Sequence, residues 1–152
     1  MKIRRINGFP SVLIVFVALI GCSAQHDANK DLRDVLRAQK IMSIEVFQIP
    51  AGIETPVAVT PDSIEQKYHA KFELRASSLL SKADALDRAL ADTDCRASTQ
   101  AVNVRTAILF FGEAGTKVRG FYYSTDGWSD QVDGTPCKLG RGLLKWAQKR
   151  LQ

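Results

Sequence analysis

Residues 102–132 read VNVRTAILFFGEAGTKVRGFYYSTDGWSDQV and contain the clearest structural signal in the chain. Two runs rich in β-branched and aromatic residues, 102–111 and 116–124, are separated by a short turn that contains glycine, and such runs favour strands. The Asp126-Gly127 pair that follows is a strong two-residue hairpin signal, and a third, shorter run comes after it. The pattern predicts a three-strand antiparallel meander.

The segments around the meander add strands and helices. We expect Asp133-Gly134 and Pro136 to end the third strand, because they are turn and breaker residues. Thr60 is a good helix cap before a proline at the first helical position. Strand patterns lie at 41–49 and 71–76, and helical periodicity lies at 31–40, 61–70, 78–91 and 142–151. The sequence therefore predicts an α+β domain with an antiparallel sheet of four to five strands, packed with three to four helices.

The first 21 residues have the organisation of a bacterial secretory signal. Lys2, Arg4 and Arg5 supply positive charge, and an apolar run of about nine residues follows at 12–20. A membrane-spanning helix needs roughly 20 apolar residues, so this run fits a signal core better than an anchor. The sequence LIGC at 19–22 resembles the bacterial lipobox.

The lipobox resemblance implies that the signal is cleaved before Cys22 and that this cysteine is acylated, which anchors the chain stably. The alternatives are a plain secretory signal that happens to end near a cysteine and an uncleaved anchor. By resemblance to the sorting rule of Gram-negative envelopes, Ser23 at the next position implies the outer membrane, facing the periplasm. Residues 22–30 are small and polar and are typical of a flexible tether. We therefore expect a signal peptide at 1–21, a tether at 22–30 and a single domain at 31–152.

The charge of the chain is largely a targeting signal. The formal net charge is +5, but cleavage removes Lys2, Arg4 and Arg5 and leaves 18 basic and 16 acidic residues, a net charge of +2. Nucleic-acid-binding proteins usually carry a strongly basic surface. We therefore expect no nucleic-acid partner.

Two cysteines remain if Cys22 carries lipid. Exported proteins fold in an oxidising compartment, where a pair of thiols tends to form a disulfide. We expect a Cys95–Cys137 disulfide, and the alternative is two free buried thiols. No histidine or other cysteine lies near either thiol in sequence, which argues against a metal site.

The sequence contains no credible catalytic set. His26 lies in the tether and His69 near a helix end, and no phosphate-binding loop or nucleophile elbow is present. Asp126, Asp130 and Asp133 lie close together, but their spacing differs from that of a calcium loop, and Asp-Gly pairs favour turns. We expect no enzyme activity, no metal and no cofactor.

Aromatic residues crowd the meander, and neighbouring residues of a strand alternate between its faces. Either both faces of the sheet are covered, or one face presents aromatic surface to a partner. Exposed aromatic residues beside a loop are typical of a recognition site. We therefore predict a partner-binding site at the hairpin, formed by Tyr122, Tyr123, Asp126 and Trp128.

The order of these features resembles that of small periplasmic immunity and lysozyme-inhibitor lipoproteins. The shared features are a lipobox, a polar tether, a small α+β domain, paired cysteines and a C-terminal helix that here contains LLKW at 143–146. The resemblance is architectural, and no site residue is carried over from it. It implies a partner that is an envelope or effector protein, such as a cell-wall-degrading enzyme whose cleft is plugged. The alternative is a structural or assembly lipoprotein of an outer-membrane or secretion complex.

Overall fold

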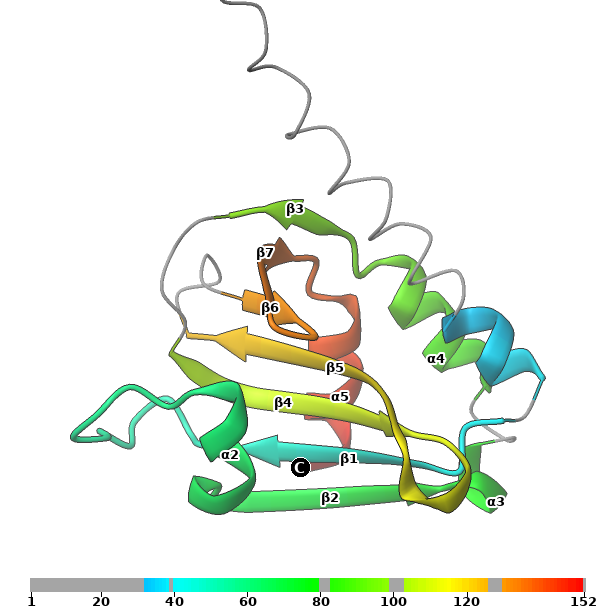
Figure 1. Ribbon diagram of the computed structural model, residues 1–152, viewed down its shortest axis with the longest axis horizontal. Helices are drawn as coiled ribbons and strands as arrows, with labels where there is room; N and C mark the ends of the chain where they lie inside the picture. The colour runs from blue at the N-terminus through cyan, green and yellow to red at the C-terminus, as the bar shows by residue number, and fades with distance from the viewer. Residues whose placement is uncertain (1–31, 39, 80–82, 99–102, 126–129, 152) are drawn as a thin grey trace, which may run out of the picture.

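The computed structural model describes residues 32–38, 40–79, 83–98, 103–125 and 130–151. Within them the chain forms one open antiparallel sheet of seven strands in the order β2-β1-β4-β5-β6-β7-β3 (Figure 1). The α+β class is confirmed, whereas the expected four to five strands were too few. The strands are β1 (Ser43–Gln48), β2 (Ala70–Arg75), β3 (Cys95–Ala97), β4 (Val104–Phe111), β5 (Lys117–Ser124), β6 (Asp130–Val132) and β7 (Thr135–Leu139).

The described residues also contain five helical segments, more than the three to four expected. They are residues 32–37, α2 (Pro61–Lys67), α3 (Ala76–Leu79), α4 (Ala83–Ala91) and α5 (Gly142–Leu151). The helix predicted at 78–91 is described as α3 and α4, and residues 80–82 between them lie outside the described part of the chain. A short 3-10 turn, η2 (Glu113–Gly115), joins β4 to β5. No helix in the described residues is long and apolar enough to cross a membrane.

The two strands that the sequence analysis missed, β3 and β7, extend the sheet beyond β6. Asp133 and Gly134 have positive φ angles of 48° and 85°, and they form the turn of a β6–β7 hairpin where we expected the sheet to end. Pro136 lies within β7 opposite Gln131. The β3 pairing begins only at Cys137, so the missing N–H of Pro136 leaves no gap in the ladder with β3.

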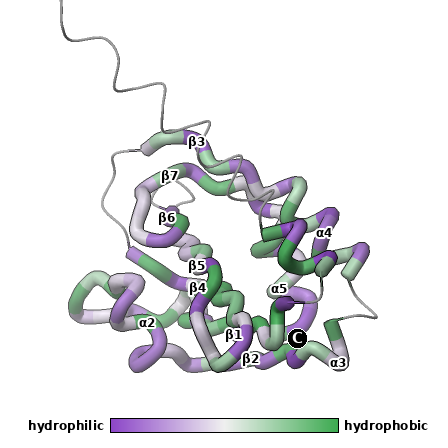
Figure 2. The backbone as a smooth tube through the Cα atoms, turned by 45° about the vertical axis from the view of Figure 1, so that its right-hand side comes forward, coloured by the Kyte–Doolittle hydropathy of each residue, from purple (hydrophilic) through white to green (hydrophobic). Residues whose placement is uncertain are grey.

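One face of the sheet is covered by the helical segment 32–37 together with α4 and α5. The larger core lies between these helices and the sheet, and hydrophobic positions run through the central strands β4 and β5 (Figure 2). Its fully buried members include Ile44, Val46, Phe110, Phe121 and Leu143. We call this side of the sheet the helical face.

Arg33 and Arg37 hold the first helical segment on α4. The Arg33 Nε lies 2.8 Å from Asp87 Oδ1, and the Arg37 Nη2 lies 2.9 Å from Asp87 Oδ2. The hydrogen bond from Arg33 is the main cause of the lowered pKa of Asp87. This link fixes the point at which the chain enters the domain.

The opposite face of the sheet is covered in part by α2 and by the loop at 49–60. Its smaller core is formed by Phe47, Ile49, Val59, Ile64, Val104, Ala107, Leu109 and Tyr122. The central strand β4 is thus buried on both faces, which explains its continuous apolar run. The aromatic residues of the meander supply both cores, because Phe110, Phe121 and Tyr123 point to the helical face and Tyr122 to the other.

Candidate functional site

Several connections meet at one end of the sheet, which we call the loop end. Strand β1 ends there, β4 begins there, and β5 ends beside the start of β4, since Val104 pairs with Ser124. The loop at 49–60 projects from this end, at the left of Figure 1. The helical segment 32–37 lies at the opposite end of β1 in the same view. The loop end is therefore remote from the helical segment 32–37 (Figure 1).

A long-range arginine contact holds the projecting loop in place. The Arg105 Nη1 donates a hydrogen bond to the Ile53 carbonyl oxygen at 2.9 Å, and its Nη2 lies 3.4 Å from the Thr55 Oγ1. Arg105 belongs to β4, more than 50 positions along the chain, so a rigid strand supports the loop. An ordered loop loses less conformational entropy when it binds a partner.

The two ends of the loop are also fixed by hydrogen bonds. The Val59 amide donates to Asn103 Oδ1 at 3.1 Å, and the Val104 amide donates to the Val59 carbonyl at 2.8 Å. Near the start of the loop, the Ile53 amide donates to the Pro50 carbonyl at 3.0 Å. The buried Val59 and half-buried Ile53 belong to the smaller core. The loop is thus anchored on both sides, and only its middle is free to meet another molecule.

The middle of the loop presents apolar surface. Glu54, Pro56, Val57 and Ala58 are exposed, and Val57 has 61% of its surface accessible. Three large hydrophobic side chains are exposed in the described part of the chain, and two of them, Val57 and Tyr68, lie at the loop end. The Tyr68 ring packs edge-on against Phe47 with centroids 5.1 Å apart, which orients it.

The third exposed residue, Met42, lies at the other end of β1. It helps to line a half-open apolar cavity of about 220 Å³ together with residues of the first helical segment, α3 and α4. This cavity lies beside the helical segment 32–37. It is separate from the loop end.

The two tyrosines of the predicted hairpin site are buried. Tyr122 and Tyr123 have only 3% and 1% of their surface accessible, so neither can present a ring to a partner in this structure. The other two predicted residues, Asp126 and Trp128, lie outside the described residues. The exposed aromatic surface that motivated the prediction is therefore not formed by these tyrosines.

Tyr122 instead forms part of the smaller core. It belongs to the core that contains Ile53 and Val59. Its ring lies over Gly120, where an added Cβ would come within 2.9 Å of ring atoms. Burial raises the pKa of Tyr122, whose hydroxyl lies 3.4 Å from the Lys117 Nζ. Gly120 is thus needed for the close approach of the ring to the strand.

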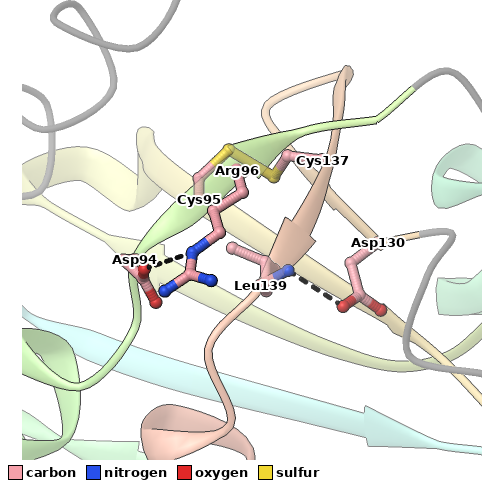
Figure 3. Close-up of a disulfide and its surroundings, with 6 residues drawn as sticks. All are labelled: Asp94, Cys95, Arg96, Asp130, Cys137 and Leu139. Carbon is pink, nitrogen blue, oxygen red and sulfur yellow. Dashed lines mark hydrogen bonds and ion pairs between the residues drawn. A yellow bond between two sulfur atoms is a disulfide. The ribbon is translucent and has the colours of Figure 1, made fainter.

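A buried carboxylate joins the residues that flank positions 126–129. Asp130 is fully buried, and its Oδ1 accepts hydrogen bonds from the Ser124 amide at 2.8 Å and the Ser124 hydroxyl at 3.1 Å. Its Oδ2 accepts from the Leu139 amide at 3.1 Å (Figure 3), and Arg141 lies 3.7 Å away. Asp130 therefore links β5 to β7 and to Arg141, which directly precedes α5. Its hydrogen-bonding capacity is largely used within the protein.

The Cys95–Cys137 disulfide is confirmed and joins β3 to β7 (Figure 3). The two Cα atoms are 5.6 Å apart. Beside it, the Thr93 hydroxyl donates to the Ala89 carbonyl at 2.7 Å and accepts from the Leu143 amide at 2.9 Å. The bridge thus belongs to a cluster that ties α4, β3, β7 and α5 together.

Neither of the described aspartates near the hairpin is arranged as a metal ligand. Asp133 pairs with Arg119 at 2.8 Å and accepts a hydrogen bond from the Gly120 amide at 2.7 Å. Within the described ranges, no three His, Cys, Asp or Glu residues are grouped so that they could hold a metal ion.

Comparisons with known proteins identify no relative. No family model, curated protein or solved structure matches this chain.

Proposed function

We propose that the chain is a lipid-anchored periplasmic binding protein that captures another envelope or effector protein through its loop end. The observation that carries the proposal is the projecting loop, which Arg105 holds from β4 and which exposes Val57. Rigid loops on a stable scaffold are typical sites of recognition. The favoured partner is a cell-wall-degrading effector whose cleft the loop enters, as the resemblance to immunity and inhibitor lipoproteins implies.

The position of the anchor supports this use of the loop. If Cys22 is acylated, about ten residues lie between the lipid and the helical segment that begins at Leu32, which allows a reach of roughly 33 Å. That segment and the loop lie at opposite ends of β1 (Figure 1). An anchored chain would therefore leave its loop accessible to a partner in the periplasm.

The shape and chemistry of the loop suit insertion into a cleft. Its exposed middle, Glu54 to Ala58, is narrow, includes a proline and ends in small apolar side chains. Apolar anchors contribute most when a partner's pocket removes them from water. The mature net charge of +2 gives little electrostatic steering, so we expect packing to dominate the affinity.

The test measures whether the chain protects peptidoglycan from hydrolysis. The full chain, purified from envelopes in detergent, is added to peptidoglycan with a panel of muramidases and amidases that includes the product of the neighbouring gene. Val57→Asp should weaken inhibition about tenfold or more, because it forces a carboxylate into an apolar contact. Arg105→Ala should weaken it as well, since the loop loses its support.

Met42→Asp is the matched control, because it makes the same chemical change on an exposed apolar residue at the opposite end of β1. It should leave inhibition unchanged, and the melting temperatures of all variants are compared with that of the wild type. Failure of the chain to bind or inhibit any of the hydrolases would refute the proposal. Co-purification with a large outer-membrane complex would then favour the assembly role.

A further inference from the structure

Strand β2 forms an edge of the sheet along which peptide groups point outward. The Ile49 amide donates to the Arg105 carbonyl of β4, so the residues of β1 that alternate with Ile49 face β2. In the observed register, these residues of β1 (Ile44, Val46 and Gln48) lie opposite Leu74, Phe72 and Ala70. Ala76, the next alternate residue after Leu74, also points its peptide group toward the first strand, because its amide donates to the Met42 carbonyl at 2.8 Å. The peptide groups of Lys71, Glu73 and Arg75 therefore face away from the sheet.

The side chains of these outward residues carry charges of both signs. Lys71, Glu73 and Arg75 are exposed, and they lie on the face opposite to that of the half-buried Phe72 and the buried Leu74. Charged edge strands commonly prevent association, particularly when one sign repeats along the edge. Here the signs alternate, so another strand can oppose each charge with its opposite.

We propose that two copies of this chain associate through antiparallel pairing of their β2 strands, with Phe72 opposite Phe72 of the second copy. This register places Lys71 opposite Glu73 of the second copy, and the reverse pair follows by symmetry. Both residues have outward peptide groups, so the two pairs form four backbone hydrogen bonds. Each pair also brings a cation and an anion directly opposite each other, which stabilises antiparallel strands.

The charges distinguish this register from its neighbours. A two-fold axis through Glu73 would oppose Glu73 to itself and Lys71 to Arg75, and an axis through Lys71 would oppose Lys71 to itself. Like charges directly opposite each other are unfavourable. Among these three symmetric registers, only the one centred on Phe72 is complementary in charge. An axis through Leu74 would oppose Glu73 to Arg75, but it would also place residues 70–72 opposite α3, which is not extended.

Within each copy the charges along this edge already have partners. Glu45 of β1 lies directly opposite Glu73, and the Lys71 Nζ lies 3.1 Å from Glu45 Oε1. Glu73 is paired with the exposed Arg75 at 2.8 Å. Lys71 of the second copy would add a cation beside Glu73, and the opposite face would bring the two half-buried Phe72 rings together. This proposal does not depend on the proposed function.

The test is sedimentation equilibrium of the full chain in density-matched detergent with micelles in excess over protein. A small edge-to-edge interface predicts weak dimers, with a dissociation constant of about 10–100 µM. Lys71→Glu places two carboxylates directly opposite each other in each pair. It should therefore weaken the dimer about tenfold or more. The double change Lys71→Glu/Glu73→Lys restores opposite charges and should return the affinity to within about threefold of the wild type.

Lys145→Glu is the matched control, because it makes the same charge change on an exposed lysine of α5, outside β2 and the proposed pairs. It should leave the dissociation constant within about threefold of the wild type. Thermal melts identify any variant that loses its fold, and the double variant separates charge from folding because it contains the same substitution. A monomeric wild type at about 100 µM overturns the proposal, as does a dimer that Lys71→Glu and Lys145→Glu affect equally.

Discussion

Removing the disulfide tests how the last two strands are held. The change is Cys95→Ala/Cys137→Ala, which avoids placing a hydroxyl group at the fully buried position 137. The bridge joins residues 42 positions apart, and the loop-entropy relation gives about 4 kcal/mol for a loop of that length. Small domains have free energies of unfolding of roughly 5–15 kcal/mol, so the variant should lose a large share of its stability.

The same loss can be expressed as a melting temperature. For a domain of this size each kcal/mol corresponds to about 3–5 °C, so we expect the melting temperature to fall by about 15 °C. The domain should still fold, because other contacts hold this region. The Gly140 amide donates to the Asp94 carbonyl at 2.8 Å, and the Leu143 amide donates to the Thr93 hydroxyl at 2.9 Å.

The assay is thermal and urea unfolding of the full chain, with and without reductant. Reduced wild type should approach the stability of the double variant, and reductant should leave the variant itself unchanged. A loss below about 1 kcal/mol would refute the reasoning, since it would mean that the bridge hardly restricts the unfolded chain.

Two further changes test the buried carboxylate and the anchor. Asp130→Ala leaves the buried amides of Ser124 and Leu139 without their acceptor, and at roughly 1–3 kcal/mol for each lost partner it should cost about 3 kcal/mol in urea unfolding. A loss below about 1 kcal/mol would show that water or a neighbouring group replaces the carboxylate. Cys22→Ala should abolish incorporation of labelled fatty acid. The variant should either remain as the uncleaved precursor or be released from the membrane. Equal labelling of wild type and variant would contradict the lipobox interpretation.

The centre of the fold could be predicted from sequence because local pattern and burial agree there. Strands β4 and β5 combine β-branched and aromatic residues with a short turn, and the structure places both where the pattern indicated. Helix α5 follows its apolar stripe, with Leu143 and Ala147 fully buried. The sequence pattern of each of these elements is therefore enough to predict its secondary structure.

The edge of the sheet could not be predicted in this way. Strand β7 has the sequence TPCKL, which contains a proline and only a short apolar alternation, Cys137 and Leu139, and β3 has only three residues. Strand β3 depends on a partner distant in sequence, through its pairing with β7 and the disulfide, whereas β7 also pairs with the adjacent β6. Turn residues such as Asp133 and Gly134 mark a reversal of the chain, but they do not say whether another strand follows.

The candidate site was missed for a related reason. Alternation requires that Tyr122 and Tyr123 face opposite sides of the sheet, but it does not show which sides are covered. Tyr122 is buried in the smaller core, to which α2 and the loop at 49–60 contribute Ile64 and Val59. The contact from Arg105 that orders this loop links residues more than 50 positions apart. The Thr55-Pro56 pair indicates a loop and gives no sign that it is held.

The proposed dimer and the proposed anchor are compatible in geometry. A two-fold axis perpendicular to the sheet keeps both helical faces on the same side, so both copies of the segment beginning at Leu32 lie on one side of the joined sheet. Two tethers with a reach of roughly 33 Å could then enter the same membrane. The axis also reverses the strand direction, so the two loop ends lie at opposite ends of the dimer and Val57 of each copy stays clear of the other. Such a dimer would present two separate binding loops from one anchored body, and two linked sites can raise the apparent affinity for a repetitive or crowded target without any new contact.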